Sequence, residues 1–144
     1  MPKQSPVPDE LTQPFFDACN EDRLVVQRCN ECTERDGLLM LQHPPMEECR
    51  RCGPHGTLEW HEVSGRGRIQ SYVTMYDTPV ASLQEDQPFN IAVIELWEDK
   101  NALFLSHLPG TPVREVPMGA EVRVVFEETP ANGQKVAEWE VVGD

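Results

Sequence analysis

The chain has 144 residues, 39% of them hydrophobic, which suffices for one moderate domain or for two small units that share a boundary. Its formal net charge of −13 argues against binding to the phosphates of a nucleic acid. Because the N-terminus begins no apolar run and no stretch is long enough to span a bilayer, we expect a cytoplasmic protein that does not bind membranes.

Residues 1–22 are expected to form an extended, proline-rich arm followed by a short helix. Thr12 is the predicted N-cap, and Pro14 suits the first turn of the helix. The apolar residues recur on one helical face, so this face either packs on the body of the chain or anchors a partner. They are Leu11, Phe15, Ala18 and Cys19, with Phe16 beside them.

Residues 23–63 are expected to form a zinc ribbon. Two Cys-x-x-Cys pairs stand sixteen residues apart, and this spacing is typical of a four-cysteine metal site. Four thiolates complete the tetrahedral shell of zinc and leave no open position, so the predicted metal is structural. A rubredoxin-type iron site has the same ligands and remains open. The predicted ligands are Cys29, Cys32, Cys49 and Cys52, and His43 and His55 lie close enough in sequence to compete with them.

Three short strands are expected around this metal, at residues 24–28, 38–41 and 57–63. After residue 64 the hydrophobic pattern has a period of two, which predicts five further strands and a small closed barrel. These strands are expected at residues 69–76, 89–97, 103–108, 121–127 and 136–142, with 89–97 as the central one. The predicted barrel core contains Ile91, Val93, Val124, Phe126 and Trp139.

Residues 64–68, Ser-Gly-Arg-Gly-Arg, join the two units. A Gly-x-Gly sequence can bind phosphate, but the dinucleotide fingerprint needs a strand before it and a helix after it, and here a strand follows. We therefore expect a bulge or a sharp bend between two sheets. A close backbone approach to a ligand is compatible with this bend.

Arginine is unevenly distributed, since seven of the nine lie within residues 23–68, whereas residues 69–144 carry a net charge of −9. An anion is therefore best accommodated near the joint. Arg66 and Arg68 share one face of an extended strand, and Arg23 and Arg28 flank the strand that enters the ribbon. The alternative is that these arginines only neutralise nearby acids, namely Glu31, Glu47, Glu48, Glu59 and Glu62.

No catalytic constellation is apparent in the sequence. Ser106 and His107 are adjacent on a predicted strand, so their side chains point to opposite faces and cannot form a nucleophile–base pair. The carboxylates are numerous but spread along the chain. We therefore expect no turnover by this chain alone.

The order of these features resembles the DUF35 family. The resemblance spans nearly the whole chain, and a longer stretch after the second cysteine, at residues 33–37, is a departure from the family pattern that we interpret as an extra loop. The residues that carry the resemblance are Pro14-Phe15, Arg23-Leu24, Gln27-Arg28-Cys29, Cys32, Pro44-Pro45, Cys49, Cys52-Gly53, Val63-Ser64-Gly65-Arg66-Gly67 and Pro117-Met118-Gly119-Ala120-Glu121-Val122.

The resemblance implies a mainly β protein: an N-terminal helix (1–22), a rubredoxin-like zinc ribbon with four cysteine ligands (23–63) and a five-stranded OB-fold barrel (64–144). It also implies a non-catalytic subunit that binds a thiolase-superfamily partner, as does the small subunit of benzoylsuccinyl-CoA thiolase. Such a subunit stabilises the partner and helps to hold the CoA thioester. From the distribution of charge, we expect Arg23, Arg28, Arg66 and Arg68 to face the nucleotide part of CoA or the acidic rim of the partner. The alternatives are a subunit of a steroid side-chain-type aldolase and an OB protein that binds single-stranded nucleic acid.

Overall fold

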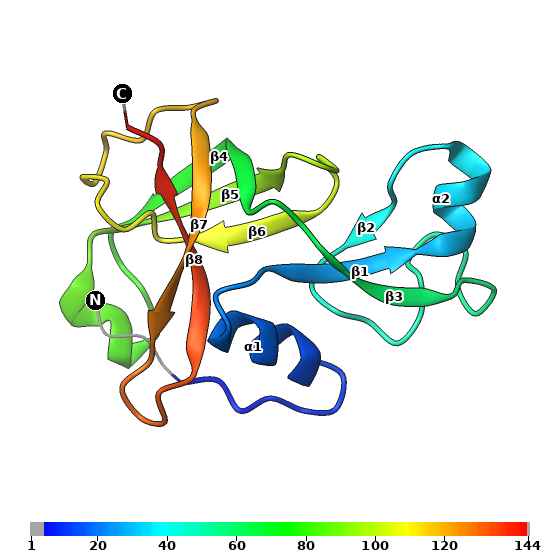
Figure 1. Cartoon of the computed structure of the whole chain (residues 1–144). Coiled ribbons are helices and arrows are strands. Elements are labelled where there is room, and N and C mark those ends of the chain that lie inside the picture. Colours follow the sequence, from blue (N-terminus) through cyan, green and yellow to red (C-terminus); the bar gives the residue numbers. More distant parts are fainter. Residues whose placement is uncertain (1–4, 144) are drawn as a thin grey trace.

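The computed structural model describes residues 5–143 and contains two antiparallel sheets (Figure 1). The three-stranded sheet has the order β2-β1-β3, and the five-stranded sheet has the order β6-β5-β4-β7-β8. In chain order the elements are α1 (Gln13–Asn20), β1 (Val25–Cys29), α2 (Asn30–Asp36), β2 (Leu41–Gln42), β3 (Leu58–Glu62), β4 (Arg66–Met75), the 3-10 helix η1 (Ala81–Asp86), β5 (Phe89–Leu96), β6 (Leu103–Ser106), β7 (Glu121–Glu128) and β8 (Lys135–Val141).

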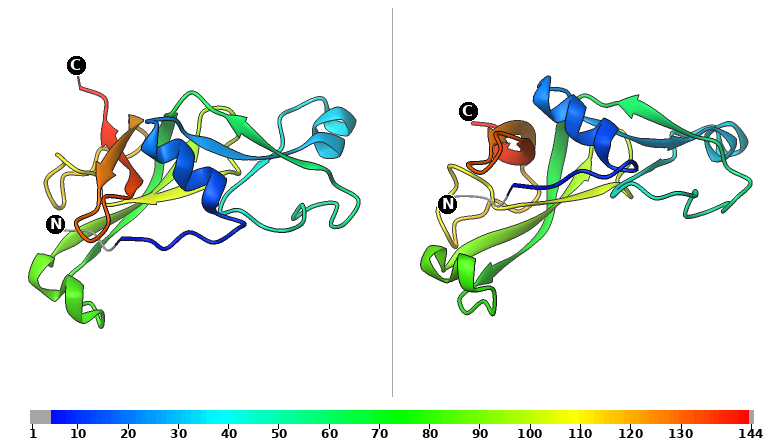
Figure 2. Two further views of the ribbon diagram at one scale, coloured as in Figure 1. Left: turned by 60° about the horizontal axis from the view of Figure 1, so that its bottom comes forward. Right: turned by 90° about the horizontal axis from the view of Figure 1, so that it is seen from below.

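The fold class agrees with the expectation, since the chain is mainly β, with an N-terminal helix, a four-cysteine ribbon and a nearly closed five-stranded barrel. Figure 2 shows the ribbon projecting from the barrel, with α1 lying between them. Within residues 5–143, no helix has both the length and the apolar character needed to cross a membrane.

Helix α1 packs on the body of the chain. Phe15, Ala18 and Cys19 are buried, whereas Phe16 is only partly buried against the same core. Thr12 occupies the predicted N-cap position, but its hydroxyl bonds no helical N–H. It donates instead to Asp9, whose carboxylate also accepts a 2.8 Å hydrogen bond from the Thr12 N–H. The turn before the helix therefore satisfies the cap residue locally.

The ribbon differs from the expectation in two places. The strand expected at residues 38–41 begins only at Leu41, and Leu38 is exposed. The segment expected to contain an extra loop forms helix α2, which ends at Gly37 with a φ of +69°. Thr33 stabilises this turn, because its hydroxyl donates to the Cys29 carbonyl (2.7 Å) and accepts from the Met40 N–H (3.1 Å). A helix of seven mostly polar residues has no apolar face that its sequence would reveal.

Strand β4 is the centre of the barrel, because β5 pairs with one of its edges and β7 with the other. The prediction that residues 89–97 form the central strand was therefore wrong, although β5 is the next strand along. The register between β4 and β5 shifts between Ile69 and Ser71, which marks a β-bulge. Such a bulge helps a small sheet to curl toward closure.

The joint is a sharp bend between the sheets, as expected. Gly65 has a φ of +78° and accepts a 2.8 Å hydrogen bond from the Val124 N–H. Gly67 lies against β5, so that a Cβ atom there would come within 2.7 Å of the Glu95 carbonyl oxygen and 2.8 Å of Ile94. Both glycines are therefore required by local geometry before any ligand is considered.

Two of the predicted core residues lie on the wrong face of β5. Ile91 and Val93 are only partly buried, whereas the alternate positions are buried. An almost continuous apolar run does not reveal which parity faces inward. The inward residues of β5 are Ala92, Ile94 and Leu96. The other three predicted core residues agree better with the structure, since Trp139 is fully buried and Val124 and Phe126 are partly buried against the same core.

A single hydrophobic cluster joins the ribbon to the barrel. It contains Leu24, Val26 and Leu41 from the ribbon, and it continues to Ile94 and Trp139 in the barrel. The cysteines form a second, smaller cluster with Met40 and the partly buried Leu58. The division at residues 22/23 and 63/64 stays a prediction, but the shared core explains how the ribbon is held against the barrel.

Candidate functional site

The four predicted metal ligands come together at the tip of the ribbon. All four Sγ atoms lie within 4.8 Å of one another, and the Cys29–Cys52 and Cys32–Cys49 separations are 3.5 and 3.8 Å. Four sulfurs bound at about 2.3 Å to one tetrahedral centre lie about 3.8 Å apart. The geometry therefore fits a four-coordinate metal ion such as zinc, with no position left for a substrate.

The electrostatics of the cluster also fit a cation. Burial raises the pKa of Cys49, but the N–H groups of Cys52 and Arg51 lower it, and the result is a pKa of about 7. For Cys52, burial and then hydrogen bonds with the other sulfurs raise the pKa to about 12. One thiolate thus forms easily and opposes the next. A bound cation removes this conflict, because all four ligands must be thiolates.

The chain around the cysteines is built to hold them close. A Cβ atom at Gly56 would lie 2.7 Å from the Cys52 Sγ and 2.9 Å from the Cys29 Sγ, so only glycine fits there. Glu31 links the two halves of the site, since its carboxylate accepts hydrogen bonds from both the N–H and the hydroxyl of Thr57. These bonds hold the pKa of Glu31 below its ordinary value.

His43 and His55, which could compete as ligands, are not in the cysteine cluster found among residues 5–143. The His43 ring stacks on Phe104, with ring centroids 3.8 Å apart and an angle of 13° between the planes, and its other neighbour is Phe15. Burial lowers the pKa of His43 to about 4, so the ring is neutral at pH 7. His43 is therefore a packing residue between α1 and the barrel.

The predicted arginine cluster comes together only in part. Arg66 and Arg68 share one face of β4, as expected from their parity, and both guanidinium groups lie over the ring of Trp97, at 4.7 and 5.1 Å from its centroid. Trp97 is 51% exposed, which leaves much of it in solvent. A shallow cavity of about 260 Å³ lies here, lined by Arg68, Glu95, Leu96, Trp97 and Lys100.

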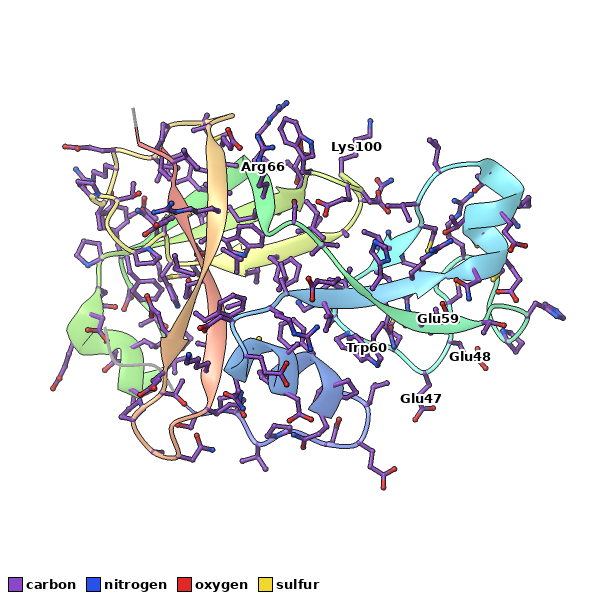
Figure 3. The ribbon with its side chains drawn as sticks, viewed as in Figure 1. Glu47, Glu48, Glu59, Trp60, Arg66 and Lys100 are labelled. Atoms are coloured by element: carbon purple, nitrogen blue, oxygen red, sulfur yellow. The ribbon has the colours of Figure 1, made fainter. Side chains whose placement is uncertain are left out.

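The structure thus adds an aromatic ring and a third cation to this predicted site. Figure 3 shows Arg66 and Lys100 on the same side of the molecule, away from Glu47, Glu48 and Glu59 of the ribbon. The β4–β5 register explains why, because Gly67 pairs with Leu96 and the Trp97 N–H donates to the Arg66 carbonyl. Periodicity does not reveal this cross-strand neighbour, although an exposed tryptophan just before a turn is a feature to notice.

The other two arginines lie elsewhere. Arg23 bonds Glu21 and Glu62, at 3.0 and 2.7 Å, and Arg28 is on β1, where its Nε is buried without a hydrogen-bond partner. One of the neutralising ion pairs expected from the sequence is therefore present, between Arg23 and Glu62. Arg66 pairs instead with Glu121, at 2.7 Å, on the neighbouring strand.

Ser106 and His107 do not pair with each other in the hydrogen bonds of the described chain. The Ser106 hydroxyl donates to Glu138 (2.7 Å) and accepts from the N–H groups of Trp139 and Leu108, both at 3.0 Å. The His107 ring lies 3.2 Å from the Asn90 carbonyl oxygen through Nδ1. Because these bonds are internal to the barrel, Ser106 holds strands together rather than facing a substrate.

An apolar surface covers the outer face of β4, β5 and β6. Val73 and Leu105 are 56% and 65% exposed, and the partly buried Ile91 and Val93 lie between them. The strand register makes the surface continuous, because Val73 pairs with Ile91 and Val93 pairs with Leu105. We call these four residues the outer apolar face. Beyond Leu105 lies a groove of about 400 Å³ that contains Phe16, Pro44 and Val136 among its walls.

Parts of this chain are similar in sequence to known proteins. Residues 60–127 match the family model for the C-terminal OB-fold domain of ChsH2. The chain is 31% identical, over 86 residues, to a DUF35 domain-containing scaffold protein from Methanothermobacter thermautotrophicus, covering 60% of this chain and 62% of that protein. It is also 29% identical, over 110 residues, to a probable enoyl-CoA hydratase alpha subunit from Thermomonospora curvata, covering 75% of this chain but only 30% of that subunit. The match therefore spans less than two thirds of either relative.

Solved structures have the same fold. The Ltp2-ChsH2(DUF35) aldolase superposes with a TM-score of 0.74 at 24% identity, over 95% of this chain and 98% of that one. A DUF35-family protein of unknown function from Sulfolobus solfataricus superposes with a TM-score of 0.60 at 17% identity, over 92% of this chain and 86% of that one. The sequence matches and the shared fold together support the expected resemblance of this chain to the DUF35 family.

Proposed function

We propose that this chain is a non-catalytic subunit of a hetero-oligomeric complex that acts on CoA thioesters, and that its partner is a catalytic subunit of the thiolase superfamily. In this role it stabilises the partner, which makes or cleaves a C–C bond. The names of two relatives support the role of a subunit in a complex that acts on CoA thioesters, since one is a scaffold protein and the other is a probable enoyl-CoA hydratase alpha subunit. The closed geometry of the cysteine cluster agrees with a metal that is structural.

The observation that carries the proposal is the outer apolar face. Exposed aliphatic side chains on adjacent strands, with exposures of 56% and 65% for Val73 and Leu105, lose contact with water when a partner covers them. Apolar residues of this kind form the centre of subunit interfaces, and the polar rim surrounds them. The acidic barrel, with a net charge of −9 over residues 69–144, supplies such a rim.

A pair of matched variants tests this interface. Leu105→Gln places an amide within the outer apolar face, whereas Met118→Gln makes the same kind of change at a residue that is 55% exposed outside it. We expect Leu105→Gln to weaken binding of the partner at least tenfold and Met118→Gln to leave it unchanged. If both variants bind the partner equally well, the outer apolar face is not part of the interface.

We also infer that Arg66, Arg68, Trp97 and Lys100 contact the nucleotide part of CoA. Guanidinium and ammonium groups bind phosphates, and an exposed indole offers a surface on which adenine can stack. The cavity of about 260 Å³ beside Trp97 supports this inference, since the rest of the barrel is acidic. Arg23 and Arg28 stay predicted contacts, but the carboxylates of Glu21 and Glu62 already bond Arg23.

An aldolase is the second candidate for the partner. The matched family model takes its name from ChsH2, and a solved structure with this fold is named as an Ltp2-ChsH2(DUF35) aldolase. Isolating the complex and assaying it for thiolysis and for aldol cleavage distinguishes the two reactions. Binding to single-stranded nucleic acid is disfavoured by charge, and a lack of mobility shift with single-stranded RNA would agree with this.

A further inference from the structure

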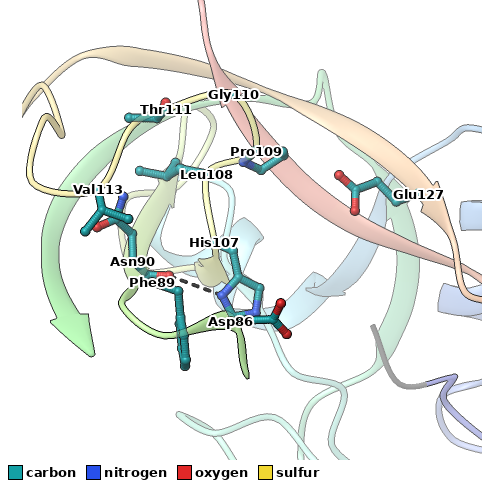
Figure 4. Close-up of a pocket in the computed structure, with 10 residues that line it drawn as sticks. All are labelled: Asp86, Phe89, Asn90, His107, Leu108, Pro109, Gly110, Thr111, Val113 and Glu127. Carbon is teal, nitrogen blue, oxygen red and sulfur yellow. Dashed lines mark hydrogen bonds between the residues drawn. The ribbon is translucent and has the colours of Figure 1, made fainter. Parts of the chain in front are cut away.

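A second cavity lies at the end of the barrel opposite the Arg66–Trp97 site. It has a volume of about 420 Å³, within the range typical of ligand sites. From Arg66 to Thr74, which pairs with Asn90 of this cavity, β4 advances eight residues, or about 25 Å. The two cavities are therefore separate. Figure 4 shows Asn90 and Val113 on one side of the cavity, Glu127 on the other, and His107 and Asp86 between them.

The cavity contains a buried donor that has no partner. Asn90 is 2% exposed, and its Nδ2 is a buried atom without a hydrogen-bond partner, while its Oδ1 lies 3.4 Å from the Thr74 hydroxyl. Buried amide N–H groups are nearly always satisfied by protein, water or ligand. The backbone carbonyl of Asn90 is already used, because it lies 3.2 Å from the His107 Nδ1. Because Asn90 lines the cavity, an acceptor that enters there would satisfy this unpaired N–H group.

The charge of the cavity determines which acceptor it admits. Within residues 5–143, the lining includes two carboxylates, Asp86 and Glu127, and no lysine or arginine. The surrounding barrel is acidic as well, since residues 69–144 carry a net charge of −9. Phosphate and carboxylate ligands are repelled here, so a neutral acceptor such as a carbonyl oxygen suits Asn90, and an accompanying cation is attracted.

We propose that this cavity binds a segment of the partner polypeptide that contains an arginine. A peptide carbonyl accepts from Asn90, and the guanidinium group lies toward Asp86 and Glu127. Phe89, whose ring is 5.4 Å from that of His107, provides an aromatic wall for the same cation. The inference rests on the proposed function, because it describes the chemistry of the partner. The cavity would give the partner a second, polar contact in addition to the outer apolar face.

The test uses the full chain, labelled with ¹⁵N, and N-acetyl-arginine N-methylamide as the probe. We expect a saturable change in the NMR signals of the Asn90 side-chain amide and of Gly110 and Thr111. The citrulline analogue keeps the shape but lacks the charge, so it should bind about two- to fivefold more weakly, the size of a partly exposed ion pair. Equal affinity for the two analogues, no saturable change, or changes confined to other residues would overturn the proposal.

Charge-neutralising variants locate the probe. Asp86→Asn and Glu127→Gln should each weaken binding of the arginine probe about two- to fivefold. Glu85→Gln is the matched control, because Glu85 is the exposed neighbour of Asp86 and does not line the cavity. An equal effect of Glu85→Gln would mean that only the general field of the barrel acts, which contradicts the proposed site. Because the probe needs no partner, these results are independent of whether the complex forms.

Discussion

The Ser106 hydroxyl donates a 2.7 Å hydrogen bond to the carboxylate of Glu138, across the gap between β6 and β8. Both residues are buried, with exposures of 3% and 6%. These are the two end strands of the five-stranded sheet, and no ladder pairs them among the described residues. Glu138 also accepts from the His107 N–H at 3.0 Å, so one carboxylate connects the two edges where backbone pairing does not.

Removing the Ser106 hydroxyl should destabilise the closure of the barrel between β6 and β8. Ser106→Ala leaves the Glu138 carboxylate with one donor fewer and removes the acceptor of the Trp139 and Leu108 N–H groups. We expect a loss of about 2–3 kcal/mol in the free energy of unfolding, measured with urea. Ser71→Ala, at an exposed serine of β4, is the control and should stay within about 0.5 kcal/mol. A loss of that small size in Ser106→Ala would show that the closure does not depend on this bond.

The ribbon should contain one zinc ion per chain. Binding to such sites is coupled to folding and is worth roughly 10–16 kcal/mol in apparent terms, so Cys29→Ser should unfold the ribbon and release the metal. Gly56→Ala should weaken metal binding, because its Cβ would lie 2.7 Å from the Cys52 Sγ. Cys19→Ala changes the fifth cysteine, which lies outside the cluster, and should keep the full metal content. Elemental analysis of fresh protein gives the result, and clearly less than one metal equivalent would refute the site.

The metal cluster was predictable because its geometry is local. Two residues between the cysteines of each pair aim both sulfurs at one point, and the structure brings all four within 4.8 Å. The approximate positions of the barrel strands followed from periodicity in the same way, whereas the ribbon strand expected at residues 38–41 lies at Leu41–Gln42. The number of strands in the barrel was also correct, since each one is separated from the next by a turn-forming segment.

Long-range relationships were not predictable. Ser106 and Glu138 are 32 residues apart, and only barrel closure brings them together. Trp97 became part of the arginine site through the register of β4 and β5, which no single strand specifies. The inward parity of β5 depends on its neighbours too, because its apolar residues occupy both faces. Each of these features belongs to the pairing of strands rather than to one segment.

His43 should make stability depend on pH. Burial lowers its pKa to about 4 in the folded chain, against about 6.5 in an unfolded one, so the unfolded state binds more protons between these values. The contribution of neutral His43 to the free energy of unfolding is fully present above pH 6.5. It is lost as the pH falls toward 4, by up to about 3 kcal/mol. His43→Phe keeps the ring stack on Phe104 without the proton. The difference in unfolding free energy between the two proteins should therefore change over this range, and a constant difference would contradict the prediction.

The arginine site should affect binding of the CoA substrate in the assembled complex. Replacing both Arg66 and Arg68 with Ala removes charged hydrogen bonds worth about 1.5–3 kcal/mol each, so we expect KM to rise about a hundredfold or more. Arg114→Ala is the matched control, because Arg114 is an exposed arginine that lies over the Tyr76 ring and does not line the cavity beside Trp97. If the double variant shows an unchanged KM and forms the complex normally, the two arginines are ordinary surface charges.

Reconstitution of activity tests most directly whether this chain is an accessory subunit. The catalytic partner is identified by isolating the tagged chain from the organism that encodes it, and it is then produced alone and assayed on its CoA thioester. We expect no turnover by the isolated chain and little by the partner, and full activity when the two are mixed. Leu105→Gln should reduce the activity recovered at limiting concentration. Full activity of the partner without this chain would contradict the accessory role.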